Sequence, residues 1–321
     1  MIGRGNISPV TINLTKAGID NGICLGKRSE PDITGFWKTL DEYIELAVQA
    51  LVERFEWQGK QIAKSAPFLY ENELLLCDRK LKPEEQVRDA IKNGTLAIGI
   101  LGLSNALVAL FGKHHAEDVT LQEFGLSVYN YVYDKAKEYS EKYDLNFSAY
   151  STPAESLCRK WLKELRKEYG IIPGVTDKEY INNSFHVPVY YPISIYEKLK
   201  IEAPYHKFST GGSISYVELD GNARNNLDAF EKIVLYAIDL GISYVAINHP
   251  IDECECGYEG IIGEYCPACD KKDGEVFIKR LRRVTGYLTA DYKTAFNDGK
   301  KAEVEDRYIH SQYQGLEDLQ E

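Results

Sequence analysis

The sequence predicts an α/β protein, because segments with a helical repeat of apolar residues alternate with short β-like runs. Residues 214–219 and 242–247 are rich in apolar and β-branched side chains, and a helical segment, 226–240, lies between them. A strand, a helix and a second strand at this spacing are typical of parallel pairing in an α/β sheet or barrel. We therefore expect parallel strands joined by helical crossovers.

The same patterns predict the other elements in chain order. Residues 10–14 form a β-like run, and apolar residues recur every three to four positions over 36–56, which indicates a surface helix with one buried face. The most apolar run, 96–111, contains Ser104 and Asn105 and is shorter than the roughly 20 residues that span a bilayer, so we interpret it as a buried helix. Gly, Pro, Asn or Asp bound the remaining predicted helices, at 84–92, 95–112, 120–141, 153–168 and 226–240.

Composition limits the partners and the number of domains. The 321 residues carry a net charge of −11, which disfavours broad contact with nucleic acid or with an anionic membrane. No basic and apolar secretory signal begins the sequence, so we expect a cytoplasmic protein. From residue 249 onward the pattern changes to a Cys/Gly-rich segment, a basic run and a polar tail. We therefore predict two domains, 1–248 and 249–321.

Four of the seven cysteines, Cys254, Cys256, Cys266 and Cys269, fall within sixteen positions. They form a C-x-C and a C-x-x-C pair separated by a Gly-rich stretch of nine residues, which resembles the two knuckles of a zinc ribbon. Four thiolates complete the tetrahedral shell of zinc, so such a site is structural and leaves no position for a substrate. We therefore predict a structural zinc site on these four cysteines.

Alternatives stay open for this cluster. The C-x-C spacing is unusual, so one of its cysteines could be a poor ligand that His249, Asp252 or Glu253 replaces. The C-x-x-C pair could instead be redox-active, or all four could be free thiols. A disulfide framework is disfavoured, because the number of cysteines in this large chain is odd.

Gly286 stands in the run Arg282–Leu288, 17 positions after Cys269. This run, downstream of a cysteine ribbon, resembles the radical loop of the anaerobic (class III) ribonucleotide reductases. Each further motif is weak alone, but the order of the motifs is very specific. The resemblance covers essentially the whole chain through Gly3–Ser8, Thr152–Ser156, Asn183–Pro188, Asn248–Pro250 and Phe296–Lys300.

The resemblance implies that Gly286 is a catalytic residue that carries a stable radical. A Cα radical needs a planar centre between its amide nitrogen and carbonyl, and glycine reaches this geometry freely because it lacks a Cβ. In the family, an activating enzyme with an iron–sulfur cluster and S-adenosylmethionine removes a hydrogen atom from this glycine. A cysteine thiyl then takes the 3′ hydrogen of a ribonucleoside triphosphate, and formate or a dithiol protein supplies the reductant. An ordinary turn glycine is the alternative.

The resemblance also implies the fold and the partners. It predicts part of a ten-stranded α/β barrel, the fold of the glycyl-radical enzymes, followed by the zinc ribbon and the radical loop. Since the family's thiyl cysteine precedes the motif at Gly3–Ser8, we expect an N-terminal half, on a partner chain or a missing segment, to supply it. The assembled enzyme is expected to be a homo-oligomer. Alternatives are a non-catalytic part that docks on an oxygen-damaged reductase, and a relative of formate acetyltransferase, which the ribbon disfavours.

Two further motifs give candidate site residues. The family places Asn6 near the substrate ribose, as a second catalytic candidate, although an Asn beside Gly5 could simply satisfy the backbone of a turn. Thr152-Pro153-Ala154-Glu155 predicts a helix start with Thr152 as N-cap, and the amides at such an end attract phosphate. In the family, the corresponding helix start receives the substrate phosphates. We therefore assign substrate binding to Thr152, Ala154, Glu155, Ser156 and, as a site-lining residue, His249.

Overall fold

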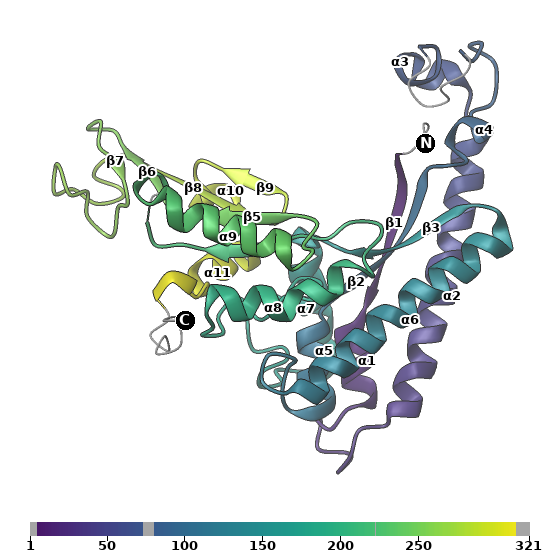
Figure 1. Cartoon of the computed structure of the whole chain (residues 1–321), viewed down its shortest axis with the longest axis horizontal. Coiled ribbons are helices and arrows are strands. Elements are labelled where there is room, and N and C mark those ends of the chain that lie inside the picture. The colour runs from purple at the N-terminus through teal and green to yellow at the C-terminus, as the bar shows by residue number, and fades with distance from the viewer. Residues whose placement is uncertain (1–4, 73–79, 222, 313–321) are drawn as a thin grey trace.

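The structure is a computed structural model of the chain, and it describes residues 5–72, 80–221 and 223–312. The elements form three groups around three sheets, which follow one another along the chain (Figure 1). Strands β1–β3 form the first sheet, β4 and β5 the second, and β6–β9 the third. Met1, Ile2, Gly3, Arg4 and Cys77 lie outside the described residues.

The first sheet is parallel, with β2 between β1 and β3. Every residue of β2 after Thr95 is buried, as expected for a central parallel strand that is covered on both faces. Helices α2 and α6 pack along this sheet, and α5 packs on α1. The elements of this group are β1 (Asn6–Asn13), α1 (Leu14–Asn21), α2 (Ile33–Gly59), α3 (Pro67–Tyr70), α4 (Arg88–Ile91), β2 (Thr95–Leu101), α5 (Leu103–Phe111), α6 (Val119–Tyr143) and β3 (Asn146–Ser151).

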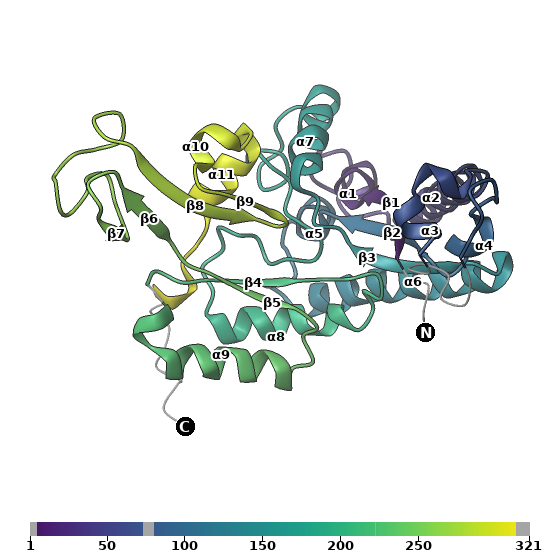
Figure 2. The same cartoon turned by 90° about the horizontal axis from the view of Figure 1, so that it is seen from above.

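The second sheet pairs β4 with β5 in parallel, and α9 connects the two strands. Figure 2 shows α8 and α9 on the same side of this pair, and Leu199, Val217 and Ile233 share one apolar cluster between them. This confirms the strand, helix and strand predicted over 214–247. The elements are α7 (Glu155–Tyr169), α8 (Ile195–His206), β4 (Ser215–Glu218), α9 (Leu227–Asp239) and β5 (Val245–Asn248).

The third sheet is antiparallel, in the order β7-β6-β8-β9. Its strands are short, and two small helices follow it on the far side from α8 and α9 (Figure 2). Sequence patterns did not predict these strands. The elements are β6 (Ile251–Cys254), β7 (Glu259–Gly260), β8 (Ile278–Val284), β9 (Tyr287–Thr289), α10 (Tyr292–Ala295) and α11 (Asp298–Asp306).

Five parallel strands, in two separate sheets, are what the described residues contribute toward a barrel. A closed ten-stranded barrel is not formed by this part of the chain, so that prediction is confirmed only as an α/β architecture. The domain boundary near residue 249 remains a prediction, although the third sheet begins two residues later, at Ile251.

The predicted helix at 95–112 is wrong in its first half, which is strand β2, and only α5 is helical. Gly102 ends the strand in the left-handed region at φ 80°, and a Cβ there would lie 2.2 Å from Thr15 Oγ1. A strand buried on both faces is apolar without alternation, so periodicity cannot separate it from a buried helix. The helix predicted at 84–92 is shorter, Arg88–Ile91, and none of the described helices is both long and apolar enough to cross a membrane.

Candidate functional site

The four clustered cysteines converge at one end of the third sheet. Cys254 ends β6, and each cysteine pair lies in a tight turn: the amides of Gly257 and Asp270, both with positive φ, donate to the carbonyl oxygens of Cys254 and Cys266. The Sγ–Sγ distance is 3.8 Å between Cys254 and Cys269 and 3.7 Å between Cys256 and Cys266. Since Zn–S bonds are about 2.3 Å long, a tetrahedron of thiolates has edges of about 3.8 Å.

This geometry decides between the ligand sets that the sequence left open. All four Sγ atoms lie within 4.8 Å of one another, so both cysteines of the C-x-C pair reach the centre. The sulfur separations are far beyond a disulfide bond of about 2.05 Å. The Asp252 carboxylate pairs with Arg280 and Arg282 instead. The donor set therefore fits a tetrahedral metal ion with four thiolate ligands and needs no substitute ligand.

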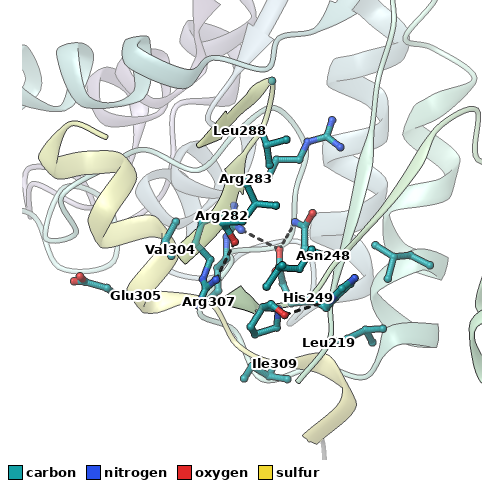
Figure 3. Close-up of a pocket in the computed structure, with 16 residues that line it drawn as sticks. Leu219, Asn248, His249, Arg282, Arg283, Leu288, Val304, Glu305, Arg307 and Ile309 are labelled. Carbon is teal, nitrogen blue, oxygen red and sulfur yellow. Dashed lines mark hydrogen bonds and ion pairs between the residues drawn. The ribbon is translucent and has the colours of Figure 1, made fainter. Parts of the chain in front are cut away.

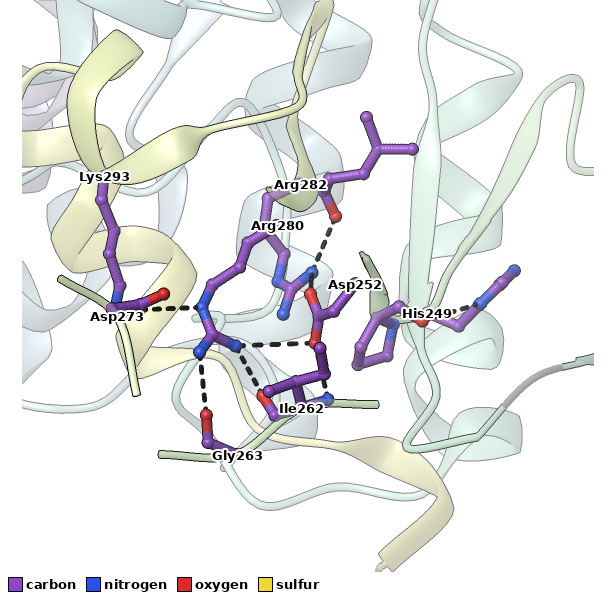
Figure 4. A network of polar contacts seen from close by, with 10 residues as sticks. His249, Asp252, Ile262, Gly263, Asp273, Arg280, Arg282 and Lys293 are labelled. Carbon is purple, nitrogen blue, oxygen red and sulfur yellow. Dashed lines mark hydrogen bonds and ion pairs between the residues drawn. The ribbon is translucent and has the colours of Figure 1, made fainter. Parts of the chain in front are cut away.

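Asp252, two residues before Cys254 on β6, pairs with two arginines of β8, the strand that leads to Gly286 (Figure 4). Its carboxylate is fully buried, accepts a hydrogen bond from the Ile262 amide at 2.9 Å, and pairs with Arg282 at 2.8 Å and Arg280 at 3.6 Å. Arg280 also donates to the carbonyl oxygens of Ile262 and Gly263, and its Nε pairs with Asp273. Two residues of the basic run at 279–283, Arg280 and Arg282, therefore form an internal brace with Asp252 through these ion pairs.

We expect Asp252→Asn to destabilise this region by about 3–5 kcal/mol, because it leaves the buried Arg280 and the partly buried Arg282 without their shared anion. Urea unfolding of the chain measures this loss. Glu253→Gln is the matched control: Glu253 pairs with Lys279 at a half-exposed site, and such pairs contribute less than about 1 kcal/mol. Equal midpoints for the two variants would contradict the brace.

Gly286 lies at the tip of the β8–β9 hairpin. Val284 pairs with Tyr287, so Thr285 and Gly286 alone form the turn. Thr285 is buried with φ 50°, a conformation that β-branched residues rarely adopt, and its carbonyl accepts a hydrogen bond of 2.7 Å from Arg283 Nε. Gly286 itself is exposed. The hairpin thus presents the glycine while the residue before it is held inside.

Gly286 and His249 line one cavity of about 570 Å³ (Figure 3). Asn248, the last residue of β5, and His249 face the β8 residues Arg282 and Arg283 across it. The prediction that His249 lines the site is consistent with this position, and its ring Nδ1 lies 3.3 Å from the Pro250 carbonyl oxygen. The other lining residues are Glu218, Leu219, Ile247, Pro250, Ile251, Leu281, Leu288, Val304, Glu305, Arg307 and Ile309.

The predicted phosphate-binding segment has a different local structure from the expected one. Helix α7 begins at Glu155, its N-cap is Ala154, and no side chain caps it. The Thr152 hydroxyl lies 3.1 Å from that of Thr11. The Thr152 amide donates to the Ile100 carbonyl oxygen, so residue 152 continues the pairing of β3 with β2. The Ala154 amide donates to Asn183 Oδ1 at 2.8 Å. Thr152 is therefore not the N-cap, and the Ala154 amide already has a partner.

Ser156 is exposed at the start of α7, and a lysine connects it to the hairpin. Lys300, a buried residue of α11, donates to Ser156 Oγ at 3.4 Å, and its Nζ lies 3.4 Å from the centroid of the Tyr287 ring. Lys300 thus connects the start of α7 to Tyr287, the residue that follows Gly286. Lys300 had no predicted role, although it ends the motif at Phe296–Lys300. The side chain of Glu155 lies outside the described part of the structure.

Asn6 is not brought to this cavity. It is exposed at the first position of β1, opposite Thr95, where the pairing is irregular between Asn6 and Ser8. It is absent from the residues that line the cavity with Gly286. Its catalytic assignment therefore remains a prediction.

Charged side chains that the sequence analysis missed lie beneath the hairpin. Arg307 pairs with Glu218 and Glu303, each at 3.4 Å, and Lys198 pairs with Glu202 at 2.6 Å. Attraction to Lys198 holds the pKa of Glu202 at about 2 in spite of full burial. Burial raises the pKa of Glu303. Lys198–Glu202 and Glu303–Arg307 have the i,i+4 spacing that exposed helical pairs also have, so the spacing does not reveal their burial.

Because two histidines are buried, we expect the folded protein to lose stability in mild acid. Burial lowers the pKa of His115 and of His310 to about 3, whereas an unfolded histidine titrates near about 6.5. Below that pH the unfolded chain binds protons that the folded chain cannot, so stability falls as the pH drops from 6.5 toward 3. Each residue should cost about 2 kcal/mol at pH 5.

Urea unfolding at pH 7.5 and pH 5 measures this dependence. His310→Asn should weaken it, because the amide oxygen can still accept from the Glu218 amide, as His310 Nδ1 does, but does not titrate. Identical free energies of unfolding at the two pH values in the wild type would contradict the assignment.

Comparison with known proteins then decides the family. The family model of the anaerobic ribonucleoside-triphosphate reductases matches residues 1–310. The chain belongs to this family. It is 35% identical over 317 residues to the anaerobic ribonucleoside-triphosphate reductase of Salmonella typhimurium, 34% identical to that of Escherichia coli, and 32% identical over 314 residues to that of phage T4. These alignments cover 96% of the chain but 43%, 43% and 49% of the relatives, so the chain corresponds to the C-terminal part of the family's proteins.

Solved structures agree on the fold. The anaerobic ribonucleotide reductase from Thermotoga maritima with MES in the active site matches 92% of this chain and 45% of its own, with a TM-score of 0.66 at 22% identity. The same protein in complex with dATP and CTP matches 94% and 44%, with a TM-score of 0.64 at 21% identity. At these identities the likeness shows the shared fold.

Proposed function

We propose that this chain is the C-terminal part of an oxidoreductase that converts ribonucleoside triphosphates to deoxyribonucleoside triphosphates by radical chemistry at Gly286. The observation that carries the proposal is the strand β8, which has the four-thiolate cluster at its start and the hairpin that presents Gly286 at its end, in a chain of the anaerobic reductase family. The structure of a relative in complex with dATP and CTP supports a nucleotide substrate. We place the reaction in the cytoplasm, where deoxyribonucleotides serve as DNA precursors.

In this proposal Cys254, Cys256, Cys266 and Cys269 hold a structural zinc ion, which folds the ribbon and fixes the start of β8. The zinc takes no part in the reaction, because four thiolates leave no open coordination position. The ion pairs of Asp252 with Arg280 and Arg282 then hold β8 against the ribbon, and the hairpin at the end of β8 is positioned as a result.

Gly286 stores the unpaired electron. An activating enzyme with an iron–sulfur cluster and S-adenosylmethionine removes one α hydrogen, and the exposure of Gly286 at the hairpin tip suits that access. The radical then takes a hydrogen atom from a cysteine thiol, and the resulting thiyl takes the 3′ hydrogen of the substrate. The 2′ hydroxyl takes up a proton and leaves as water, formate or a dithiol protein provides two electrons, and a second proton enters at the 2′ carbon. The cysteine then returns the hydrogen atom to the 3′ carbon, which regenerates the thiyl and, from it, the radical at Gly286.

Substrate phosphates bind at the start of α7. Ser156 is exposed there, the amides of Glu155 and Ser156 belong to the first helical turn, and Lys300 adds a positive charge next to Ser156. Since the Ala154 amide and the Thr152 hydroxyl have protein partners, we assign those two residues to shaping the turn. His249 lines the cavity beside Gly286, and Asn6 would act on the ribose.

The N-terminal half of the family's proteins is the proposed partner, because strands β1 and β5 each have one edge that is unpaired among the described residues. Within the described ranges β1 pairs with β2 alone, and β5 with β4 alone. Beside β5, helix α9 exposes Leu227, Leu235 and Ile238. Unpaired strand edges offer free backbone hydrogen-bonding groups, and exposed apolar faces mark interaction sites, so both are commonly covered by a partner. We propose that the half supplying the thiyl cysteine pairs with these edges, and that the assembled enzyme is a homo-oligomer.

Reconstitution tests this function. The chain is purified without oxygen and mixed with a matching N-terminal reductase segment, the activating enzyme, S-adenosylmethionine and a ribonucleoside triphosphate. Deoxyribonucleotide should form only when both parts are present. Binding of the chain to an oxygen-cleaved full-length reductase, with none to the isolated segment, would instead identify a replacement part.

A further inference from the structure

A small cavity lies against the hairpin that carries Gly286, with Thr285 among its lining residues. Its volume is about 20 Å³, and one water molecule needs about 10–15 Å³. Glu303 lines it from α11, and Arg307 lines it from the segment that follows α11. The other lining residues are Asn183, His186, Val187, Val189, Lys198, Tyr216, Glu218 and His310.

Two buried polar atoms in this lining have no hydrogen-bond partner among the described residues. They are the hydroxyl Oγ1 of Thr285, a residue that is 3% exposed, and Nε of Arg307, whose side chain is 10% exposed. Each residue is otherwise firmly placed: Thr285 by its turn and Arg307 by its pairs with Glu218 and Glu303. Buried groups of this kind are nearly always satisfied, by protein or by an ordered water.

The lining favours a neutral ligand over an ion. Two cationic side chains, Lys198 and Arg307, face two carboxylates, Glu218 and Glu303, so no charge of one sign dominates. A water molecule can accept the Arg307 N–H, bond to the Thr285 hydroxyl, and donate to a carboxylate. A larger anion does not fit the volume.

We infer that this cavity binds a single structural water that links Thr285 Oγ1 to Arg307 Nε, and that Thr285 is thereby a positioning residue for Gly286. The conformation of Thr285 supports this link. A β-branched residue at φ 50° persists only where its surroundings hold it, and that conformation sets the direction in which the chain enters Gly286. The inference rests on the proposed function in one respect: the position of Gly286 matters because Gly286 is the proposed radical residue.

Two variants of Thr285 separate the hydroxyl from the shape of the side chain. Thr285→Val keeps the shape and removes the hydroxyl, so hydrogen–deuterium exchange of the Gly286 and Tyr287 amides should accelerate about tenfold, the loss of one good hydrogen bond. Thr285→Ser keeps the hydroxyl and should restore wild-type exchange within about twofold. Thr210→Val, at an exposed turn, is the matched control and should change nothing at the hairpin.

A crystal structure of the wild-type chain supplies the independent measurement. Density for one water within hydrogen-bond distance of Thr285 Oγ1 and Arg307 Nε is expected, and its absence at high resolution would overturn the site. Unchanged exchange in Thr285→Val, or equal acceleration in Thr285→Ser, would overturn the positioning role. Neither measurement needs a radical. A reductase that shows no glycyl radical would therefore refute the proposed function and leave the water site standing.

Discussion

Gly286→Ala should abolish both the radical and the oxygen-dependent cleavage of the chain. After anaerobic activation, air should cut the wild type at Gly286, because oxygen adds to the Cα radical and the backbone breaks there. Since 35 residues follow Gly286, mass spectrometry should find a large fragment ending near Thr285 and a small one beginning near Tyr287. The alanine variant should stay intact, because its methyl group crowds the planar radical centre.

The control for this variant is Gly263→Ala. Gly263 is exposed in the same ribbon, and a Cβ there meets no heavy atom within 4 Å, so the variant should activate and be cleaved as the wild type is. Both variants should keep their zinc. Cleavage of Gly286→Ala at the same position would refute the assignment of the radical to this residue.

Cys266→Ser and Cys269→Ser should each release the metal and unfold the ribbon. Structural zinc contributes on the order of 10–16 kcal/mol to the folding of small zinc domains, so the loss of one thiolate removes much of the stability of this region. The purified wild type should contain about one zinc ion per chain. Because the ribbon anchors β8 through Asp252, the hairpin should lose its protection from proteases at the same time.

Cys24→Ser provides the comparison, because Cys24 lies outside the cluster and should not affect the zinc content. Cys254→Ser and Cys256→Ser should resemble Cys266→Ser, since all four Sγ atoms share one centre. Elemental analysis without zinc in the wild type, or an absorption spectrum of an iron–sulfur cluster, would overturn the metal assignment.

The features that sequence alone predicted are local in the chain. The four cysteines and Gly286 lie within 33 consecutive positions, so spacing and motif order were enough to select them. Helix 36–56 was predicted from its helical repeat of apolar residues and helix 120–141 from the residues that bound it, and the structure confirms both as α2 and α6.

What the sequence did not predict depends on contacts between distant segments. Lys300 and Ser156 are 144 positions apart, and Arg307 and Glu218 meet only because α11 packs beneath the hairpin. Thr152 looked like an N-cap, yet pairing of β3 with β2 continues through its amide and moves the helix start to Glu155. The strand β2 lacked alternation because both of its faces are buried.

Electron paramagnetic resonance of the activated enzyme tests the central claim most directly. The chain, assembled with its N-terminal half, is reduced and activated without oxygen by the activating enzyme and S-adenosylmethionine. The account predicts a doublet, split by the one α hydrogen that remains on Gly286, and its collapse to a single line when the protein is made with α-deuterated glycine. A doublet that persists after deuteration, or in Gly286→Ala, would contradict it, as would the absence of any radical in an enzyme that reduces nucleotides.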